Sequence, residues 1–386
     1  MLKRILIERY KSIKSADITF GKINVLIGEN GAGKSNLISF IELCQSTDLD
    51  LYVRTHLGMG RLLHGGAKKS KEFSGTLVFE SLPDETDLQD GKASDCAVAL
   101  TVATAIDGIT PVVVEKAQYL NIPSDKDYEL GDKHLIGGLE ELRRIDRLNL
   151  SMNHQRSSEA LATTVFQTYY LKVPIDSVKI YHFCDTGDHA GIRGMSNLND
   201  NVCLKKDGSN LASVLYLISQ NSPHTFKMIE AMMRRVAPYF QCFELKPDRL
   251  NPNLITLEWK EKDSDIYCDS TSFSDGTIRF LALCVLLMQP NPPATIIIDE
   301  PELGLHPSAI SIIGALVRRA AHKTQVIVAT QSADLISEFS IDEIIVVDRI
   351  KGESVFHKLE ERDFEQWLDH YTLGDIWKKN LIGGRP

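Results

Sequence analysis

Short apolar stretches, several of them followed by turn residues, open the chain. Leu2 to Ile7, Ile18 to Phe20 and Ile23 to Ile27 are rich in aliphatic and β-branched residues and predict strands. The last of these runs directly into glycines, and Ser35 to Cys44 beyond them carries apolar residues at nearly helical spacing. The N-terminal segment therefore predicts the order strand, Gly-rich loop, helix.

The next part of the chain predicts an antiparallel sheet and then helices. Strand patterns recur at Gly75 to Glu80, Ala97 to Ala105 and Pro111 to Leu120, with an Asp107-Gly108 turn between the last two. The Gly- and Lys-rich stretch from Leu57 to Ser74 predicts a surface loop. Four segments have helical periodicity and predict a helical insertion: Leu135 to Leu150, Ser158 to Tyr170, Leu211 to Ser219 and Thr225 to Val236.

The C-terminal third alternates strands and helices. Thr277 to Met288 and Pro307 to His322 predict helices. The predicted strands are Leu254 to Trp259, Thr295 to Ile298 and Gln325 to Ala329. The sequence contains no internal repeat and no low-complexity tract.

Composition excludes some classes of protein. The chain has 386 residues, of which 43% are hydrophobic and 25% are charged, which is typical of a folded protein with a sizeable core. A net charge of −9 argues against coating nucleic acid by bulk charge. The seven cysteines form no C-x-x-C pair, which favours a reduced, cytoplasmic protein. The longest apolar run, Phe280 to Met288, is about half of a bilayer span, and no signal-like stretch opens the chain, so we expect no membrane segment.

One segment predicts a nucleotide site with little ambiguity. The stretch Gly28 to Ser35 fits G-x-x-x-x-G-K-[ST] and lies between a predicted strand and a predicted helix. Glycines let consecutive N–H groups and the helix N-terminus face phosphates, Lys34 reaches the β- and γ-phosphate oxygens, and the Ser35 hydroxyl ligates Mg²⁺. The predicted ATP-binding residues are Gly28, Glu29, Asn30, Gly31, Ala32, Gly33, Lys34, Ser35 and Asn36.

A second motif supplies two carboxylates. Thr295 to Glu300 is an apolar strand ending in Asp299 and Glu300, the pattern of a Walker B segment. Acids that end a buried strand are often only the polar residues at which the chain leaves the sheet. Together with the Gly28 to Ser35 motif, a P-loop, they favour a role in metal-assisted hydrolysis. We predict that Asp299 holds Mg²⁺ and that Glu300 polarises the attacking water.

A third motif lies just upstream. Phe273 to Thr277 is a small-residue turn directly before a predicted helix. Ser-Asp-Gly is also an ordinary helix N-cap, so this turn has a purely structural interpretation. Its position before the Walker B strand favours nucleotide contact by Ser274, Asp275 and Gly276.

These motifs, together with Asp299 to Pro307 and Thr330 to Ser332, resemble those of the SMC, RecF and OLD branch of ABC ATPases. The resemblance is strongest to compact bacterial ATPases that are sometimes encoded with nucleases or in phage-defence loci. It implies an α/β P-loop fold of the ABC-ATPase head type, with an antiparallel β lobe and a helical insertion. We expect residues 1–130 and 251–386 to form the head and 131–250 the mainly helical insertion. It also implies that two heads enclose two ATP molecules, so that Ser274 of one subunit completes the site of the other.

The chain departs from that pattern in two places. Gln331 stands where ABC ATPases usually have a switch histidine, and an amide cannot take a proton, so we expect slow or partner-dependent hydrolysis. The Q-loop glutamine cannot be placed: Gln118 and Gln155 are candidates, and a surface glutamine in another loop is the favoured interpretation of each.

Other clusters carry weaker predictions. For DNA, a solvated face is favoured over contact at each of three basic groups: Arg143, Arg144 and Arg147; Lys68, Lys69 and Lys71; Arg234 and Arg235. His182, beside Tyr181 and Phe183 and followed by Asp185 and Arg193, is expected to pack rather than catalyse. Asp342, Glu343 and Asp348 flank the predicted strand Ile344 to Val347 and are interpreted as residues of a sheet edge and turn rather than as a metal site. Only 55 residues follow Gln331, too few for a separate nuclease domain with its own metal-binding acids, so we expect none in the chain. The Leu373 to Leu381 helix with Trp377 and the terminal Gly-Gly-Arg-Pro either covers the core or docks a partner.

The function that follows is a Mg²⁺-dependent ATPase that forms a homodimer around ATP and acts as a switch for DNA or a partner effector, such as a nuclease in anti-phage defence or DNA repair. Two alternatives stay open. The first is an ATP-sensing scaffold with little hydrolysis, which Gln331 favours. The second is the ATPase subunit of a membrane transporter, against which the Asp299 to Pro307 pattern and the Lys11-Ser12 opening speak.

Overall fold

The computed structural model describes residues 1–46, 48–56, 58–80, 94–104, 111–123, 175–360, 362, 364, 367 and 370–384. At 50, 94–95 and 111–123 only the backbone is described. The predicted helices Leu135 to Leu150 and Ser158 to Tyr170 and the Asp107-Gly108 turn lie outside these residues.

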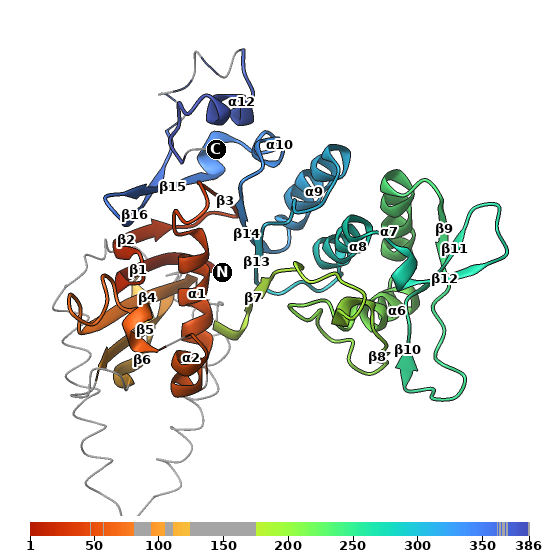
Figure 1. The fold of residues 1–386 in the computed structure, drawn as a ribbon, viewed down its shortest axis with the longest axis horizontal. Helices are drawn as coiled ribbons and strands as arrows, with labels where there is room; N and C mark the ends of the chain where they lie inside the picture. The colour runs from red at the N-terminus through yellow and green to blue at the C-terminus, as the bar shows by residue number, and fades with distance from the viewer. Residues whose placement is uncertain are drawn as a thin grey trace, which may run out of the picture.

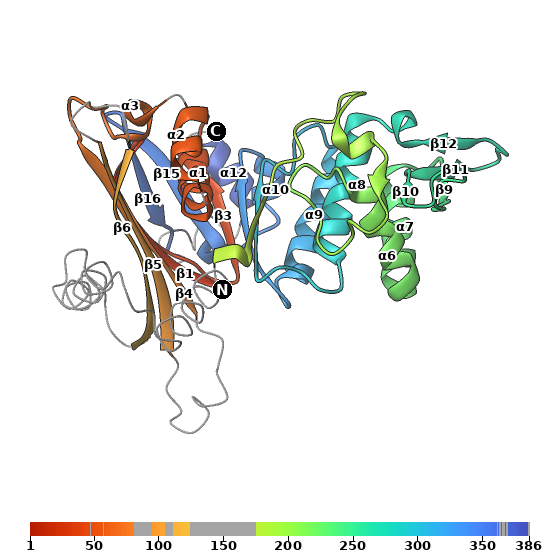
Figure 2. The same ribbon diagram turned by 90° about the horizontal axis from the view of Figure 1, so that it is seen from below.

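Two sheets enclose the first helix. In Figures 1 and 2, α1 (Lys34–Gln45) lies between a five-stranded and a six-stranded sheet, with α2 (Leu49–Thr55) beside it. The five-stranded sheet has the antiparallel order β2-β1-β4-β5-β6, as the alternation and turn residues predict. Its strands are β1 (Leu2–Tyr10), β2 (Ile13–Thr19), β4 (Glu72–Glu80), β5 (Ser94–Thr104) and β6 (Pro111–Pro123).

The segment Leu57 to Ser74 is not the surface loop that its composition predicts. It contains α3 (Met59–Leu62), and Met59 and Leu62 are fully buried in the core under the antiparallel sheet. The two apolar side chains at i and i+3 lie on one helical face, and their burial outweighs the surrounding glycines and lysines. Lys68, Lys69 and Lys71 are exposed, as predicted.

The six-stranded sheet holds the motifs. Its order is β16-β15-β3-β14-β13-β7, parallel from β15 to β7 with β16 as an antiparallel edge. Because side chains alternate along β3, Val25 and Ile27 belong to one core and Leu26 to the other. The carboxyl ends of the parallel strands meet at one edge of the sheet. The strands are β3 (Ile23–Ile27), β7 (Val178–Tyr181), β13 (Thr295–Asp299), β14 (Gln325–Thr330), β15 (Ile344–Ile350) and β16 (Glu353–Lys358).

A buried glutamine joins the N-terminal strand to this sheet. Gln325 donates from Nε2 to the carbonyl oxygens of Leu2 (2.7 Å) and Gly21 (2.8 Å). Its Oε1 accepts from the Leu2 N–H (3.0 Å) and from the Thr295 hydroxyl (2.9 Å). All four hydrogen-bonding positions of the amide are thereby used, so an otherwise costly buried polar group links the sheets.

The other face of the six-stranded sheet is covered by helices. The helices α8 (Asp275–Met288) and α9 (Pro307–Ala320) share one core with α6 (Leu211–Asn221) and α7 (Pro223–Val236), which form the separate lobe of Figures 1 and 2. The described part of 131–250 thus contains two helices, but also β7, which belongs to the central sheet. The rest of the lobe is η1 (Gly191–Arg193), β8 (Ser196–Asn197), β9 (Phe240–Phe243), β10 (Leu254–Ile255), β11 (Glu258–Glu261), β12 (Tyr267–Asp269) and η2 (Ser270–Ser272).

The predicted strand Leu254 to Trp259 was wrong as a single element. Its first part, β10, pairs with β8, whereas its second part belongs to β11, which pairs with β9 and β12. Leu257 is buried between the two parts, and the chain changes sheets around it. The apolar pattern is continuous across the change, so it does not reveal the break.

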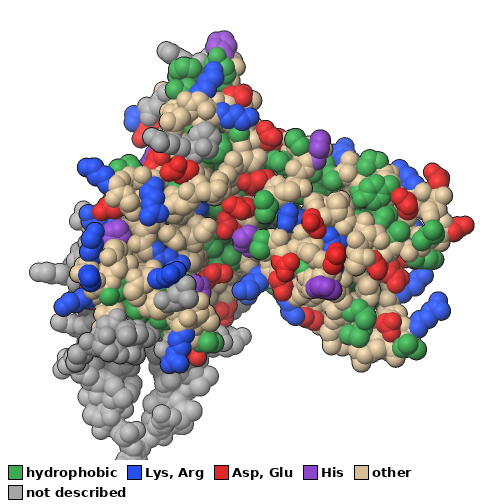
Figure 3. Space-filling view, in the orientation of Figure 1, with side chains coloured by type: hydrophobic (Ala, Val, Ile, Leu, Met, Phe, Trp, Pro, Cys, Tyr) green, Lys and Arg blue, Asp and Glu red, His purple; other side chains and the backbone are tan. Residues whose placement is uncertain are grey.

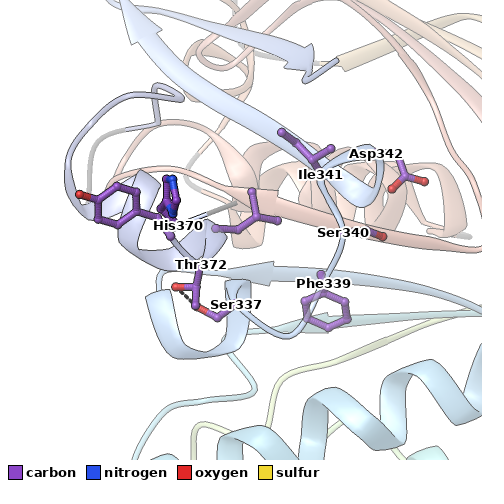
Figure 4. Close-up of a pocket in the computed structure, with 9 residues that line it drawn as sticks. Ser337, Phe339, Ser340, Ile341, Asp342, His370 and Thr372 are labelled. Atoms are coloured by element: carbon purple, nitrogen blue, oxygen red, sulfur yellow. Dashed lines mark hydrogen bonds between the residues drawn. The ribbon is translucent and has the colours of Figure 1, made fainter. Parts of the chain in front are cut away.

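The C-terminal segments pack on the core. Trp377 and Ile376 of α12 (Leu373–Lys378) and the nearby Ile382 are buried in it, consistent with the covering role of this helix. Figure 4 shows a pocket of about 550 Å³ between α12 and the segment that joins α10 (Ala333–Ile336) to η3 (Ile341–Glu343), where the Ser337 hydroxyl donates to that of Thr372 at 3.2 Å. Among the described residues, no helix is both long and apolar enough to span a membrane.

Candidate nucleotide-binding site

The P-loop is a tight glycine turn between β3 and α1. Gly31 and Gly33 have φ values of 81° and 125°, which L side chains rarely adopt. A Cβ at Gly33 would lie 2.1 Å from the Ser354 Oγ, so β16 closes against the loop. No side chain caps α1 and its first turn carries no acidic residue, which leaves its N-terminus to an anion.

A polar network supports the loop from behind. The Asn36 amide donates to the Ser12 Oγ at 2.6 Å, and the Ser12 and Ser354 hydroxyls lie 2.6 Å apart. The Ser354 hydroxyl donates to the Ala32 carbonyl at 2.5 Å, and Arg349 donates to the Gly31 carbonyl at 2.8 Å. The loop is therefore held by segments from both ends of the chain.

Lys34 is buried and surrounded by acids. Its ammonium donates to the carbonyl oxygens of Gly28 (2.5 Å) and Glu29 (3.2 Å). Burial lowers the pKa of Lys34, while the charges of Asp299, Glu300 and two further glutamates raise it. The lysine and the Walker B acids thus face one another across the loop. Ser35, in the first turn of α1, is exposed.

The two predicted carboxylates stand at the end of β13 and directly after it. Asp299 is its last residue, and burial raises the pKa of this carboxyl, as does the charge of Glu300, whereas His182 and Lys34 lower it. Glu300 has a φ of 50° and donates its N–H to the Ala329 carbonyl of β14 at 2.8 Å. A non-glycine residue is held in this left-handed conformation only by its surroundings.

Gln331 joins the P-loop to the Walker B segment. Its Nε2 donates to the Asn30 Oδ1 at 2.7 Å and to the Glu300 Oε1 at 2.8 Å. The predicted switch residue therefore contacts both the P-loop and the predicted catalytic glutamate. The structure brings together residues that are 301 and 31 positions apart in the sequence.

Glu302 is a site residue that the sequence reasoning did not single out. Its Oε1 accepts from the Thr330 hydroxyl (2.6 Å) and from the Gln331 N–H (2.9 Å). Its Oε2 is buried and has no hydrogen-bond partner among the described residues. The carboxylate therefore positions the backbone that carries Gln331. The feature of the sequence that could have indicated this role is the position of Glu302 two residues after Glu300.

The charges at this edge fit a divalent cation. The orphaned Oε2 of Glu302 and the raised pKa of Asp299 mark an excess of negative charge that one buried lysine does not balance. Among the described residues, no three His, Cys, Asp or Glu side chains form a metal site by themselves. Mg²⁺ is commonly held by one or two protein oxygens with phosphates and water, and Ser35 and Asp299 can supply such oxygens.

The third motif, the turn Phe273 to Thr277, leads into α8 and is called the signature turn below. Ser274 caps α8: its Oγ accepts from the Thr277 N–H at 3.2 Å and lies 2.8 Å from the Thr277 hydroxyl. A Cβ at Gly276 would lie 2.3 Å from the Gly304 carbonyl oxygen, so this turn packs against the loop that follows Glu300. Arg279 reinforces the contact by donating to the Leu303 carbonyl. The core of α8 is on the face of the sheet opposite α1.

His182 lies at the carboxyl edge of the six-stranded sheet rather than in the core. It is exposed and follows β7, whose Tyr181 is in register with Ile298 of β13, so it is the neighbour of Asp299 across the sheet. Its charge lowers the pKa of Asp299. The expectation that His182 packs was wrong, because β7 ends where β13 ends. Of the Q-loop candidates, Gln118 belongs to β6 of the five-stranded sheet, and Gln155 lies outside the described residues.

Comparison with known proteins agrees with this geometry. Residues 112–337 match the family described as "AAA domain, putative AbiEii toxin, Type IV TA system". The chain belongs to this AAA-domain family. A comparison with curated proteins gives no match.

Solved structures of SMC heads share the fold of this AAA-domain protein. An SMC head bound to the C-winged helix domain of ScpA is 16% identical, with a TM-score of 0.59 over 94% of this chain and 99% of that one. An SMC head with an extended coiled coil, bound to the C-terminal domain of ScpA derived from Pyrococcus furiosus, is 15% identical, with a TM-score of 0.54 over 95% and 98%. The predicted P-loop fold of the SMC and ABC branch is confirmed.

Basic side chains on the AAA-domain protein do not single out a DNA site. On the face in Figure 3, Lys and Arg side chains are spread along the left edge, over the antiparallel sheet, rather than gathered into one patch. Arg234 is engaged, donating to the Gln241 carbonyl at 2.6 Å, whereas Arg235 is exposed. Arg143, Arg144 and Arg147 lie outside the described residues.

Proposed function

We propose that this AAA-domain protein binds ATP with Mg²⁺ between the P-loop and the end of β13 and hydrolyses it. The observation that carries the proposal is the Gln331 amide, which donates to both Asn30 and Glu300. Segments far apart in the chain thereby share one network at the carboxyl edge of a parallel sheet, where open α/β sheets bind ligands.

Each residue has a defined task in this proposal. The P-loop N–H groups and the N-terminus of α1 cradle the phosphates, and Lys34 turns from its own loop carbonyls to the β- and γ-phosphate oxygens. Glu300 polarises the attacking water, and Gln331 orients it or the γ-phosphate. Ser35 and Asp299 would hold Mg²⁺, which would supply positive charge against the charge that develops on the phosphate oxygens.

ATP is also proposed to join two copies of the chain. The cores of α1 and α8 lie on opposite faces of the six-stranded sheet, and the Ser274 hydroxyl hydrogen-bonds to Thr277 of its own turn. A turn so placed suits contact with the γ-phosphate in a second subunit better than contact with its own. Two-fold symmetry then builds two identical composite sites.

The work of the dimer is proposed to be that of a cytoplasmic switch. ATP closes the pair, hydrolysis opens it, and the change in shape controls a partner effector or DNA. A nuclease acting in anti-phage defence or DNA repair is the partner that the sequence resemblance favours.

One observation favours a second function, an ATP sensor with little turnover. The Gln331 amide donates a hydrogen bond to the Glu300 carboxylate at 2.8 Å, and an amide cannot accept a proton from the attacking water. In that case ATP binding alone sets the state of the dimer, and a partner or DNA supplies whatever accelerates hydrolysis.

Steady-state ATP hydrolysis with Mg²⁺ tests the proposal, with and without double-stranded DNA. The variants are Lys34→Ala and Glu300→Gln, and Arg235→Gln on an exposed helix face is the control. We expect turnover in the wild type and the control, loss of at least about 10²-fold in the other two, and ATP binding retained in Glu300→Gln.

The outcomes separate the two functions. Absent turnover in the wild type, despite ATP binding that requires Lys34, would leave the sensor. Stimulation by DNA identifies DNA as a ligand of the switch. ATP binding that survives Lys34→Ala unchanged would remove the P-loop from the account altogether.

A further inference from the structure

We propose that Arg193 is a positioning residue that neutralises Asp275 in the signature turn, so that this turn can accept a γ-phosphate bound to a second copy of the chain. The inference rests on the proposed function, because it assumes that ATP joins two subunits at this turn. It concerns a residue that the motifs leave unassigned.

The guanidinium of Arg193 is bound on all sides. Its side chain is only 4% exposed, and its Nε donates to the Thr186 carbonyl at 2.7 Å. Its Nη1 donates to two carbonyl oxygens, those of Ser270 (2.5 Å) and Phe273 (2.9 Å). Nη2 donates to the Asp275 Oδ1 at 2.9 Å.

These bonds fix Ser274 from both sides. Arg193 contacts Phe273 before it and Asp275 after it. The hydroxyl of Ser270, in the η2 turn, returns a bond to the Arg193 carbonyl at 2.6 Å. The segment on either side of Ser274 therefore lies against one buried cation, which contacts the Phe273 carbonyl and the Asp275 carboxylate.

The charge of Asp275 explains why a cation is needed. Asp275 is the first residue of α8 and its side chain is 67% exposed, so it lies at the surface where the second subunit would meet the turn. The hydrogen bond from Arg193 lowers the pKa of this carboxyl, which keeps it ionised. A carboxylate suits a helix N-terminus, but it repels a triphosphate at the same place.

Pairing with Arg193 removes that repulsion. The pair has no net charge, and its guanidinium is anchored by the Thr186 and Ser270 carbonyls. The signature turn then presents the Ser274 hydroxyl and the helix N-terminus to the phosphate. An unpaired Asp275 would leave a negative charge facing the γ-phosphate, at a cost that weakens the dimer.

Sedimentation velocity of the ATP-loaded protein tests this charge argument. All variants are made in a Glu300→Gln background, where ATP is held without turnover. We expect Arg193→Gln to weaken dimerisation by at least about tenfold. Adding Asp275→Asn should restore it to within about threefold, because the repelling charge is gone. Asp275→Asn alone should dimerise as well as the parent or better, and Arg235→Gln, with the same change in net charge, should match the parent.

A merely structural role for Arg193 gives a different result. The double variant would then dimerise no better than Arg193→Gln, which would overturn the inference. If Arg193→Gln does not fold, Arg193→Lys replaces it: retained charge should keep dimerisation within about tenfold of the parent, and a complete loss would count against neutralisation. A dimer weakened by Asp275→Asn alone would also overturn it.

Failure of the proposed function is recognised separately. If the Glu300→Gln parent binds ATP through Lys34 but stays monomeric, the ATP-joined dimer itself is wrong. If the parent dimerises and the rescue by Asp275→Asn is absent, only the role of Arg193 is wrong.

Discussion

Gly276→Ala sets helix propensity against packing at the signature turn. Gly276 is the second residue of α8, and alanine in a helix is normally better than glycine by about 1 kcal/mol. Here the added Cβ would lie 2.3 Å from the carbonyl oxygen of Gly304. That contact must open by roughly an ångström, and overpacking of this kind costs about 1–3 kcal/mol.

Packing should win at this position. The obstructing atom is a backbone oxygen, and the Gly304 segment is held by Arg279, which donates to the neighbouring Leu303 carbonyl. We expect a net loss of about 1–2 kcal/mol, or a fall of about 1–3 °C in the midpoint of thermal unfolding. Gly60→Ala is the matched control, because nothing lies within 4 Å of a Cβ at this glycine of α3, and it should be neutral or stabilising.

Both calorimetry and ATP turnover measure the result. The segment that moves in Gly276→Ala also carries Glu300, so turnover should fall by more than the fraction unfolded explains. A Gly276→Ala protein as stable and as active as the wild type would refute the reasoning, since the signature turn and the loop after Glu300 would then not be in rigid contact.

Three further changes test other parts of the structure. Gln325→Leu removes the amide that contacts both backbone groups of Leu2, and it should lower the free energy of unfolding by about 3 kcal/mol in denaturant titration; an unchanged midpoint would contradict the network. Without Mg²⁺ and nucleotide, Asp299→Asn should raise the midpoint of thermal unfolding at neutral pH, because the raised pKa of Asp299 means that its ionised carboxyl destabilises the folded protein. This gain should vanish below about pH 4, where the carboxyl is protonated in the folded and in the unfolded protein. His182→Ala should lower kcat by about tenfold with ATP affinity retained, and an unaltered kcat would place the imidazole outside the site.

Contiguous motifs were readable from the sequence because their geometry is local. The P-loop needs glycines at fixed offsets between a strand and a helix, and Asp299 with Glu300 directly follows a buried strand. The helix after Ser274 was placed within two residues of its observed start. Local propensity and turn chemistry decide such features.

Contacts between distant segments were not readable. His182 meets Asp299 only through the register of β7 with β13, and an apolar run does not state which strand it pairs with. Arg193 reaches Asp275 across 82 positions, and Ser12 reaches Ser354 across 342. Such pairs depend on the order of strands in the sheet, which one sequence without relatives does not determine.

The central claim is that each ATP is enclosed by the P-loop of one subunit and the signature turn of another. Mixing two inactive proteins tests it most directly: Lys34→Ala, which lacks the P-loop lysine, and Ser274→Arg, which blocks the signature turn. A heterodimer of the two has one intact composite site, so an equimolar mixture should regain about a quarter of wild-type turnover. A mixture with no more activity than its separate components would contradict the account, because each site would then be complete within one chain.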